Sequence, residues 1–148
     1  MSAFEPKDPD WEVRVRASYA RQPFMEHLGA VLSHLAPGEA DIAMAFRPEL
    51  TQQHGFFHAG TTTSIADSAA GYAALTLYPQ GTGVLTTEFK INLLNPGRGA
   101  RLVARGRVLK PGRTLTVCRA DVYGLSDGGE THVATGLFSM ICLEGMAD

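Results

Sequence analysis

Asp67 is the residue whose setting most favours chemistry, because it is the only formally charged side chain between Ala59 and Pro79. This charge-poor stretch is rich in small residues and predicts a buried helix, in which Asp67 lies about two turns from the start. A carboxylate at that depth cannot cap the helix, and its burial is costly unless it is paired, hydrogen-bonded or functional. The alternative is a place on a solvated stripe with Thr63 and Ser64.

The start of the same segment offers a second chemical feature. His58, Ala59 and Gly60 precede three threonines there. The first N–H groups of a helix lack internal partners and carry partial positive charge, so they can polarise a carbonyl oxygen as an oxyanion hole does. A small residue at position 59 lets a substrate approach the backbone. The alternative for His58 is an ordinary capping or loop histidine.

The spacing of these two features constrains any shared reaction. Ala59 and Asp67 are eight positions apart, which corresponds to about 12 Å along one helix. A single carbonyl group cannot contact both. If both serve one reaction, Asp67 comes from a second copy of the chain with an antiparallel helix, and we expect an obligate dimer with two equivalent sites about a two-fold axis.

The elements that position these residues are predicted from apolar alternation and from turns rich in glycine and proline. A helical segment from about Trp11 to Leu28, with a break at Pro23 and a stop at Gly29, comes first. Two strands (about 30–35 and 40–46), the long helix (about 59–78) and four strands (about 84–94, 100–110, 114–123 and 131–142) follow. Short turns join consecutive strands and indicate antiparallel hairpins. We expect one α+β domain over 1–148, with an antiparallel sheet around the helix and an N-terminal helical extension over about 1–28.

Composition excludes several classes of protein. The chain has 148 residues and a net charge of -2, which disfavours binding of nucleic acid through a basic surface. Cys118 and Cys142 lie in strand-like runs and read as reduced core thiols, and no Cys/His spacing suits zinc. The charged N-terminus is unlike a signal peptide, and the charge-poor helix lacks the large apolar residues of a membrane span. We expect a cytoplasmic protein that needs neither metal nor redox cofactor and binds no membrane.

The stretch from Leu50 to Ala74 resembles the signature of the hotdog-fold thioesterases, and is most similar to the PaaI-like (phenylacetate-pathway) group of acyl-CoA thioesterases. That group combines an asparagine, a His-Gly-Gly turn, a leucine and an aspartate. The matching positions here are Gln52, His58, Ala59, Gly60, Ile65 and Asp67. The later strand and turn layout is also similar, and the resemblance spans about 30–143. Gln52 replaces the asparagine, with Gln53 as a rival for its role, and Ala59 replaces the first glycine.

The resemblance implies hydrolysis of an acyl- or aryl-CoA to the free acid and CoA, with coenzyme A as part of the substrate. Asp67 is then the nucleophile or the general base that activates water, and the Ala59 N–H binds the thioester oxygen. His58 shapes the loop at the helix start, and Gln52 helps to hold the carbonyl or the attacking water. Thr86 matches a hydroxyl residue that orients this water across the subunit boundary. The implied assembly is a homo-oligomer, either the dimer that the site requires or a homotetramer.

A basic cluster offers contacts for the phosphates of coenzyme A. Its members are Arg98, Arg101, Arg105, Arg107, Lys110 and Arg113. The turn from Lys110 through Gly112 to Arg113 suits phosphate, and with Gly60 and Phe57 it forms the expected substrate-binding set. The alternatives are a charged sheet edge for the cluster and core packing for the phenylalanine.

Two other functions fit the same fold. A non-catalytic module that binds acyl-CoA would not need a buried carboxylate at the reacting centre, so Asp67 favours the thioesterase. A hydratase or dehydratase would pair a catalytic histidine with an acid in a different motif, which is absent from the sequence. No Ser-His-Asp arrangement is evident, and the identity of the acyl group stays open.

Overall fold

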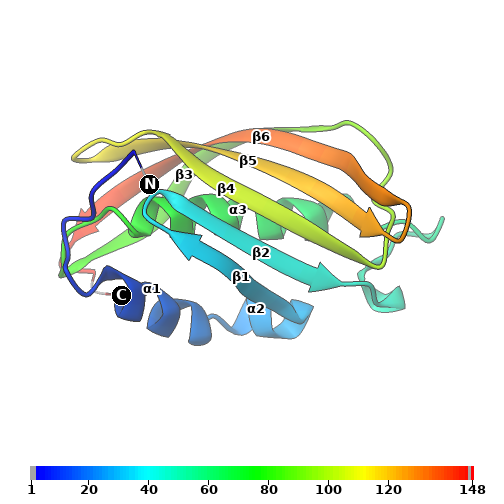
Figure 1. Cartoon of the computed structure of the whole chain (residues 1–148), viewed down its shortest axis with the longest axis horizontal. Coiled ribbons are helices and arrows are strands. Elements are labelled where there is room, and N and C mark those ends of the chain that lie inside the picture. Colours follow the sequence, from blue (N-terminus) through cyan, green and yellow to red (C-terminus); the bar gives the residue numbers. More distant parts are fainter. Residues whose placement is uncertain (1–2, 147) are drawn as a thin grey trace.

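The computed structural model describes residues 3–146 and 148, which form a curved antiparallel sheet around one long helix (Figure 1). The helices are α1 (Trp11–Ala20), α2 (Pro23–Leu28) and α3 (Ala59–Leu75), and η1 (Pro48–Leu50) is a single 3₁₀ turn. The strands are β1 (Ala30–Ala36), β2 (Glu39–Ala45), β3 (Thr82–Leu93), β4 (Arg101–Lys110), β5 (Leu115–Ser126) and β6 (Gly129–Glu144). Their order in the sheet is β1-β2-β4-β5-β6-β3. The expected α+β architecture is confirmed.

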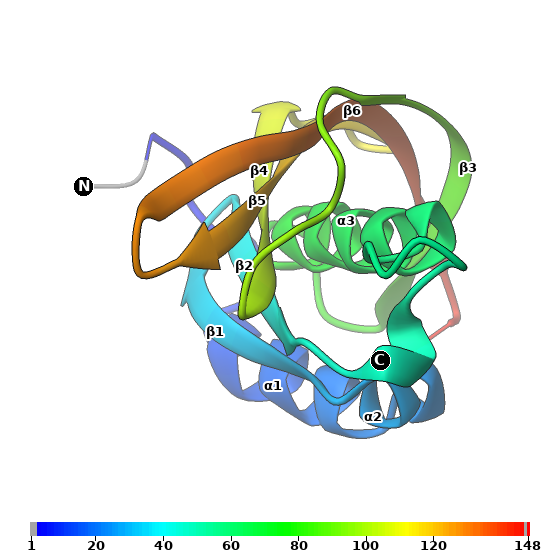
Figure 2. The ribbon, with the colours of Figure 1, turned by 90° about the vertical axis from the view of Figure 1, so that its right-hand side faces the viewer.

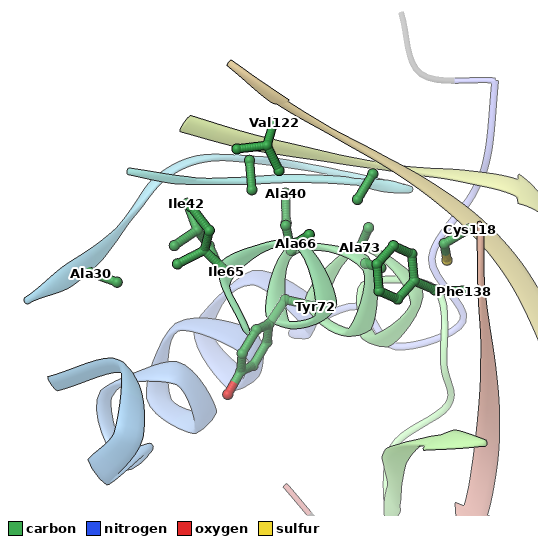
Figure 3. Close-up of a cluster of buried hydrophobic side chains, with 14 of the residues drawn as sticks. Ala30, Ala40, Ile42, Ile65, Ala66, Tyr72, Ala73, Cys118, Val122 and Phe138 are labelled. Atoms are coloured by element: carbon green, nitrogen blue, oxygen red, sulfur yellow. The ribbon is translucent and has the colours of Figure 1, made fainter. Parts of the chain in front are cut away.

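Small side chains on α3 let the sheet close tightly around the helix. Ala66 and Ala73 are fully buried and face the sheet, close to Val122 and Phe138 (Figure 3). On β4, a Cβ added at Gly106 would lie 2.3 Å from a backbone oxygen of α3. Only glycine fits at that point, so the alanine-rich composition of the helix and the glycine in the strand serve the same close approach.

The N-terminal helices cover the side of α3 that the sheet leaves open (Figures 1 and 2). Pro23 is the first residue of α2, a position that proline favours, and Gly29 ends that helix in the left-handed conformation with φ 65°. Arg14 of α1 donates a 2.7 Å hydrogen bond to the carbonyl of Tyr78 and forms a 2.8 Å ion pair with Asp8. This buried pair fixes α1 to the C-terminal end of α3.

The helix α3 is slightly shorter than the predicted 59–78. It ends at Leu75, after which the N–H groups of Leu77 and Tyr78 bond to carbonyls three residues back, at 3.0 and 3.1 Å. Such bonds tighten the last turn into 3₁₀ geometry, so the chain leaves the α-helix before it reaches Pro79.

Three further observations concern cysteines, membrane spans and metal-binding groups. Cys118 and Cys142 are free thiols, as predicted. Across residues 3–146 and 148, no helix is long and apolar enough to cross a membrane. In the same residues, His, Cys, Asp and Glu side chains do not gather into a group of three that could hold a metal ion.

Candidate active site

The first turn of α3 presents one free backbone donor. His58 caps the helix, and its Nδ1 accepts a 2.7 Å hydrogen bond from the Gly60 N–H. The N–H groups of Thr61 and Thr62 bond to the His58 carbonyl at 3.0 and 3.1 Å. Among the hydrogen bonds of the described residues, none uses the N–H of Ala59, which is exposed. That N–H is therefore available to an external acceptor.

The local backbone explains the residues at positions 59 and 60. No described residue other than glycine has a positive φ, so Ala59 is unstrained where the resembling family has glycine. At Gly60, an added Cβ would lie 2.9 Å from His58 Nδ1. Gly60 thus makes room for the capping imidazole, and the small residue and the histidine act together to shape the helix start.

A pocket of about 370 Å³ opens beside the free N–H and is called here the amide pocket. Its lining includes Gln52, Phe56, Phe57, Ala59 and Thr62, with the turn at 93–97 and Val133. The Gln52 Oε1 accepts a hydrogen bond from the His54 N–H. Gln53 does not line the pocket, so the geometry favours Gln52 in the family's asparagine position.

Phe57 anchors this pocket to the rest of the fold. It is buried, its N–H donates a 2.9 Å hydrogen bond to the Gly97 carbonyl, and its ring packs edge-on against Phe46. The neighbouring Phe56 is half-buried beneath the guanidinium of Arg98, which lies 4.5 Å from the ring centroid. Phe57 is consequently both a core residue and a wall of the pocket.

Asp67 lies in a second pocket of about 250 Å³, called here the carboxylate pocket. Its lining is Ser18, Gln22, Asp67, Ser68, Gly71, Tyr72, Val84, Leu85, Thr86 and Asp148. The Thr86 hydroxyl donates a 2.7 Å hydrogen bond to Asp67 Oδ1. Asp67 is half-buried and forms no ion pair with any described residue. Burial raises the pKa of its carboxyl above the usual value, and the Thr86 hydrogen bond offsets part of that rise.

The two pockets share no lining residue. Ala59 and Asp67 are eight residues apart on α3, a separation of about 12 Å. Thr86 belongs to the Asp67 half, because both residues meet within one chain. Gly71, on the same helix, has open space beside it. Within one chain, Ala59 and Asp67 therefore lie in two separate pockets.

The predicted phosphate-binding turn lies far from the amide pocket within a chain. Gly112 and Arg113 line another pocket with Lys7 and Tyr78, beyond the C-terminal end of α3, and Ala59 starts the opposite end of that helix. Lys110 is exposed at the end of β4. These residues stay predicted substrate contacts. Lys7 adds a basic group that the sequence did not single out.

Other members of the basic cluster differ in their surroundings. Arg105 forms a 2.8 Å ion pair with Glu130, and Arg107 forms a 2.5 Å pair with Asp41. Both belong to charge pairs across the sheet, in line with the sheet-surface alternative. Arg98, over Phe56, is the member of the cluster that lies beside the amide pocket.

Sequence reasoning missed a polar wall of the carboxylate pocket. Ser18 and Gln22 come from the N-terminal helical region, and Ser68 and Tyr72 from α3. No periodicity or spacing in the sequence links the N-terminal helices to the middle of α3, because that proximity arises from tertiary packing.

Comparison with known proteins identifies the family. The family model of the thioesterase superfamily matches residues 54–130. A thioesterase family protein from Silicibacter pomeroyi is 47% identical with a TM-score of 0.90, over 91% of this chain and 99% of that one. Acyl-coenzyme A thioesterase 13 of Homo sapiens is 28% identical, over 77% of this chain and 82% of its own length.

The fold is also that of the E. coli PaaI protein from the phenylacetic acid degradation operon. The TM-score is 0.82 over 92% of this chain and 95% of that one, at 21% identity. The arrangement of helix and sheet thus agrees with the sequence resemblance, and the chain belongs to the thioesterase superfamily with its hotdog fold.

Proposed function

We propose that this protein is an acyl-CoA thioesterase, which hydrolyses an acyl- or aryl-CoA of the kind used by PaaI-like enzymes to the free acid and CoA. The observation that carries the proposal is Asp67, a half-buried carboxylate without a cation, held by Thr86 on the helix whose first N–H is free. A polarised carbonyl and an activated oxygen nucleophile are what thioester hydrolysis requires.

The complete site is proposed to lie between two copies of the chain. Strand β3 is a sheet edge that pairs only with β6, and Leu85, Phe89 and Leu93 on it are 48%, 49% and 54% exposed. A long apolar edge strand is suited to pair with a second copy. Antiparallel pairing about a two-fold axis would bring Ala59 of one copy towards Asp67 of the other.

A homotetramer is the proposed larger assembly. Leu109, Leu115 and Leu137 are about half-exposed on β4, β5 and β6, where buried residues alternate with them. Alternation along a strand puts these leucines on the face of the sheet turned away from α3. Burial of such side chains between two dimers would stabilise the pair of dimers.

In the proposed reaction the thioester oxygen accepts a hydrogen bond from the Ala59 N–H, which stabilises the negative charge that develops on it. Asp67 either removes a proton from a water that attacks the carbonyl carbon or attacks that carbon itself. In both routes the C–S bond breaks, the acyl carbon gains the attacking oxygen, and the CoA sulfur leaves as the thiolate and takes up a proton. When Asp67 itself attacks, the product is a mixed anhydride, which a water then hydrolyses to release the free acid and restore the carboxylate. Thr86 holds the carboxylate in position, and Gln52 and His58 keep their expected roles at the helix start.

Coenzyme A enters this scheme as part of the substrate. Lys110, Gly112 and Arg113 are the proposed contacts for its phosphates, and Gly60 and Phe57 those for the thioester end. Arg98 beside the amide pocket supports a basic path for the nucleotide. Use of an acyl-CoA also fits the cytoplasmic location expected from the sequence.

Thiol release from a panel of acyl-CoAs, compared between the wild type and Asp67→Asn, tests the proposal. We expect turnover on at least one member of the panel and a fall in turnover of about two orders of magnitude or more in the variant.

Charge reversal at Lys110 and Arg113 should raise KM for acyl-CoA but not for a short thioester without the nucleotide. Binding of acyl-CoA without any turnover would contradict the proposed thioesterase activity and would indicate the non-catalytic binding module instead.

A further inference from the structure

The polar wall of the carboxylate pocket comes partly from outside the segment that the family model matches. Ser18 is a buried residue near the end of α1, and Gln22 lies in the short link between α1 and α2. Both precede residue 54, where the match to the superfamily begins. Opposite them, Tyr72 points from α3 toward the N-terminal helices (Figure 3). The Ser18 and Gln22 side of the wall therefore lies outside the matched segment, and the Tyr72 side lies inside it.

A directional chain of hydrogen bonds orders the wall. Ser68 donates to Gln22 Oε1 at 3.3 Å, and Gln22 Nε2 donates to the Tyr72 hydroxyl at 3.2 Å. Ser18 donates to Asp148 Oδ1 at 3.0 Å, so it accepts from Tyr72 across 3.5 Å. The Gln22 amide is therefore held in one orientation, and the second of its two N–H groups has no acceptor among the described residues.

The charge of the pocket determines which end of a thioester substrate it suits. Asp67 and Asp148 both place carboxyl groups on its lining. Two carboxylates disfavour the phosphates of coenzyme A. An acyl group that extends from a carbonyl beside Asp67 meets open space at Gly71 and then the wall at Gln22. The pocket accordingly suits the acyl end of the substrate.

We infer that Gln22 is a specificity-determining residue, which selects a short acyl group with a neutral hydrogen-bonding group, such as a hydroxyl, at its far end. This inference rests on the proposed function. A volume of about 250 Å³ exceeds that of the roughly 150 Å³ cavity that accepts benzene, and it suits an acyl group of about six to eight carbons. A hydrocarbon end would leave the Gln22 N–H without an acceptor, and a carboxylate end would meet Asp67 and Asp148.

Matched substrates test the inference. We would measure kcat/KM for hexanoyl-CoA, 6-hydroxyhexanoyl-CoA, adipoyl-CoA and hexadecanoyl-CoA with the wild type and Gln22→Leu. The wild type should prefer the hydroxylated substrate over hexanoyl-CoA by about tenfold and disfavour the other two. In Gln22→Leu the ratio should fall to about one, chiefly through a loss with the hydroxylated substrate.

Two controls separate selection from folding. Gln80→Leu makes the same change at an exposed position outside the pocket and should leave the ratio unchanged. Tyr72→Phe removes one hydroxyl of the wall but keeps the ring, so it tests the wall even if Gln22→Leu does not fold, and it should lower the ratio in part.

The possible failures are distinguishable. No thiol release from any acyl-CoA would overturn the proposed function and this inference with it. Hydrolysis without a preference for the hydroxyl would overturn the inference alone. An equal loss on hexanoyl- and 6-hydroxyhexanoyl-CoA in Gln22→Leu, with a lower Tm, would assign Gln22 a purely structural role and also overturn it.

Discussion

The two pockets along α3 are built in opposite ways. The amide pocket centres on a backbone group, the Ala59 N–H, and its walls come from the loop before the helix and the turn before β4. The carboxylate pocket centres on a side chain, Asp67, and its walls come from β3 and the N-terminal helices. A backbone donor tolerates a change of side chain, whereas a carboxylate does not. This difference explains why alanine can replace a glycine at position 59, while the proposed reaction depends on the aspartate itself.

The pockets also differ in what supports them. His58 and Gly60 shape the amide pocket locally, through a cap within three residues. Residues from α1 and the link after it complete the carboxylate pocket, and Arg14 fixes α1 through distant contacts. The helix cap beside the first pocket is therefore a property of the motif, whereas the polar wall of the second pocket depends on the tertiary fold.

The largest expected effect follows from Asp67→Asn, which removes the carboxylate at the centre of the carboxylate pocket. We expect kcat to fall by about two orders of magnitude or more, because the neutral amide neither attacks nor accepts a proton. The free energy of unfolding, in contrast, should increase in Asp67→Asn near neutral pH. Burial raises the pKa of Asp67 in the folded protein, so its ionised form destabilises the fold above that pKa.

Thermal unfolding across pH checks the second part. The variant should have a higher Tm than the wild type near neutral pH. The difference should shrink as the pH falls through the folded pKa towards the unfolded value, because Asp67 is then protonated in both states. A wild type that is more stable than Asp67→Asn at neutral pH would contradict the cost assigned to this carboxylate.

Removal of the free backbone N–H of the amide pocket should have the next largest effect. Ala59→Pro deletes the free N–H, and proline suits the first position of a helix. His58 precedes it with φ -62° and ψ 140°, an extended conformation that a residue before proline can adopt. We expect kcat to fall about a hundredfold with the helix intact. Ala59→Gly keeps the N–H and is the matched control, which should stay close to the wild type.

A smaller effect is expected from Thr86→Val, which removes the hydrogen bond to Asp67. That bond lowers the pKa of the carboxyl, so its loss should raise the pKa further and move the rising limb of the pH–rate profile to higher pH. At pH values below that limb, the activity of Thr86→Val should be about tenfold lower than that of the wild type. Thr87→Val removes a hydroxyl that bonds instead to the Ser139 carbonyl, and an equal shift in that variant would contradict the assignment.

Loss of a support of the carboxylate pocket should affect stability rather than the chemical step. Arg14→Met leaves Asp8, which is 2% exposed, without its cation. We expect a loss of about 3 kcal/mol in the free energy of unfolding in urea. Arg16→Met breaks an exposed pair with Glu12 on the same helix and should cost only about 0.5 kcal/mol. Equal losses would show that the Arg14 pair has no special role.

The sequence predicted the fold and the centres of both pockets, because these depend on local patterns. The alternating strands, the small residues of α3 and the isolated Asp67 are all visible without tertiary information. The wall of Ser18, Gln22 and Tyr72 was not predictable, since it joins segments about fifty positions apart through packing alone. The sequence did not predict that Arg113 and Ala59 are separated by the length of α3. Residues that lie close together along the chain can still lie at different places around the sheet.

The measurement that tests the central claim most directly is complementation between Asp67→Asn and Ala59→Pro. Each variant alone should be nearly inactive. If each site combines Ala59 of one copy with Asp67 of another, a mixed dimer contains one intact site, and random equal mixing after unfolding and refolding should restore about a quarter of the wild-type activity. If Ala59 and Asp67 act within one chain, or if only one of them is needed, mixing will give no activity beyond the sum of the two variants, and that result would contradict the shared site.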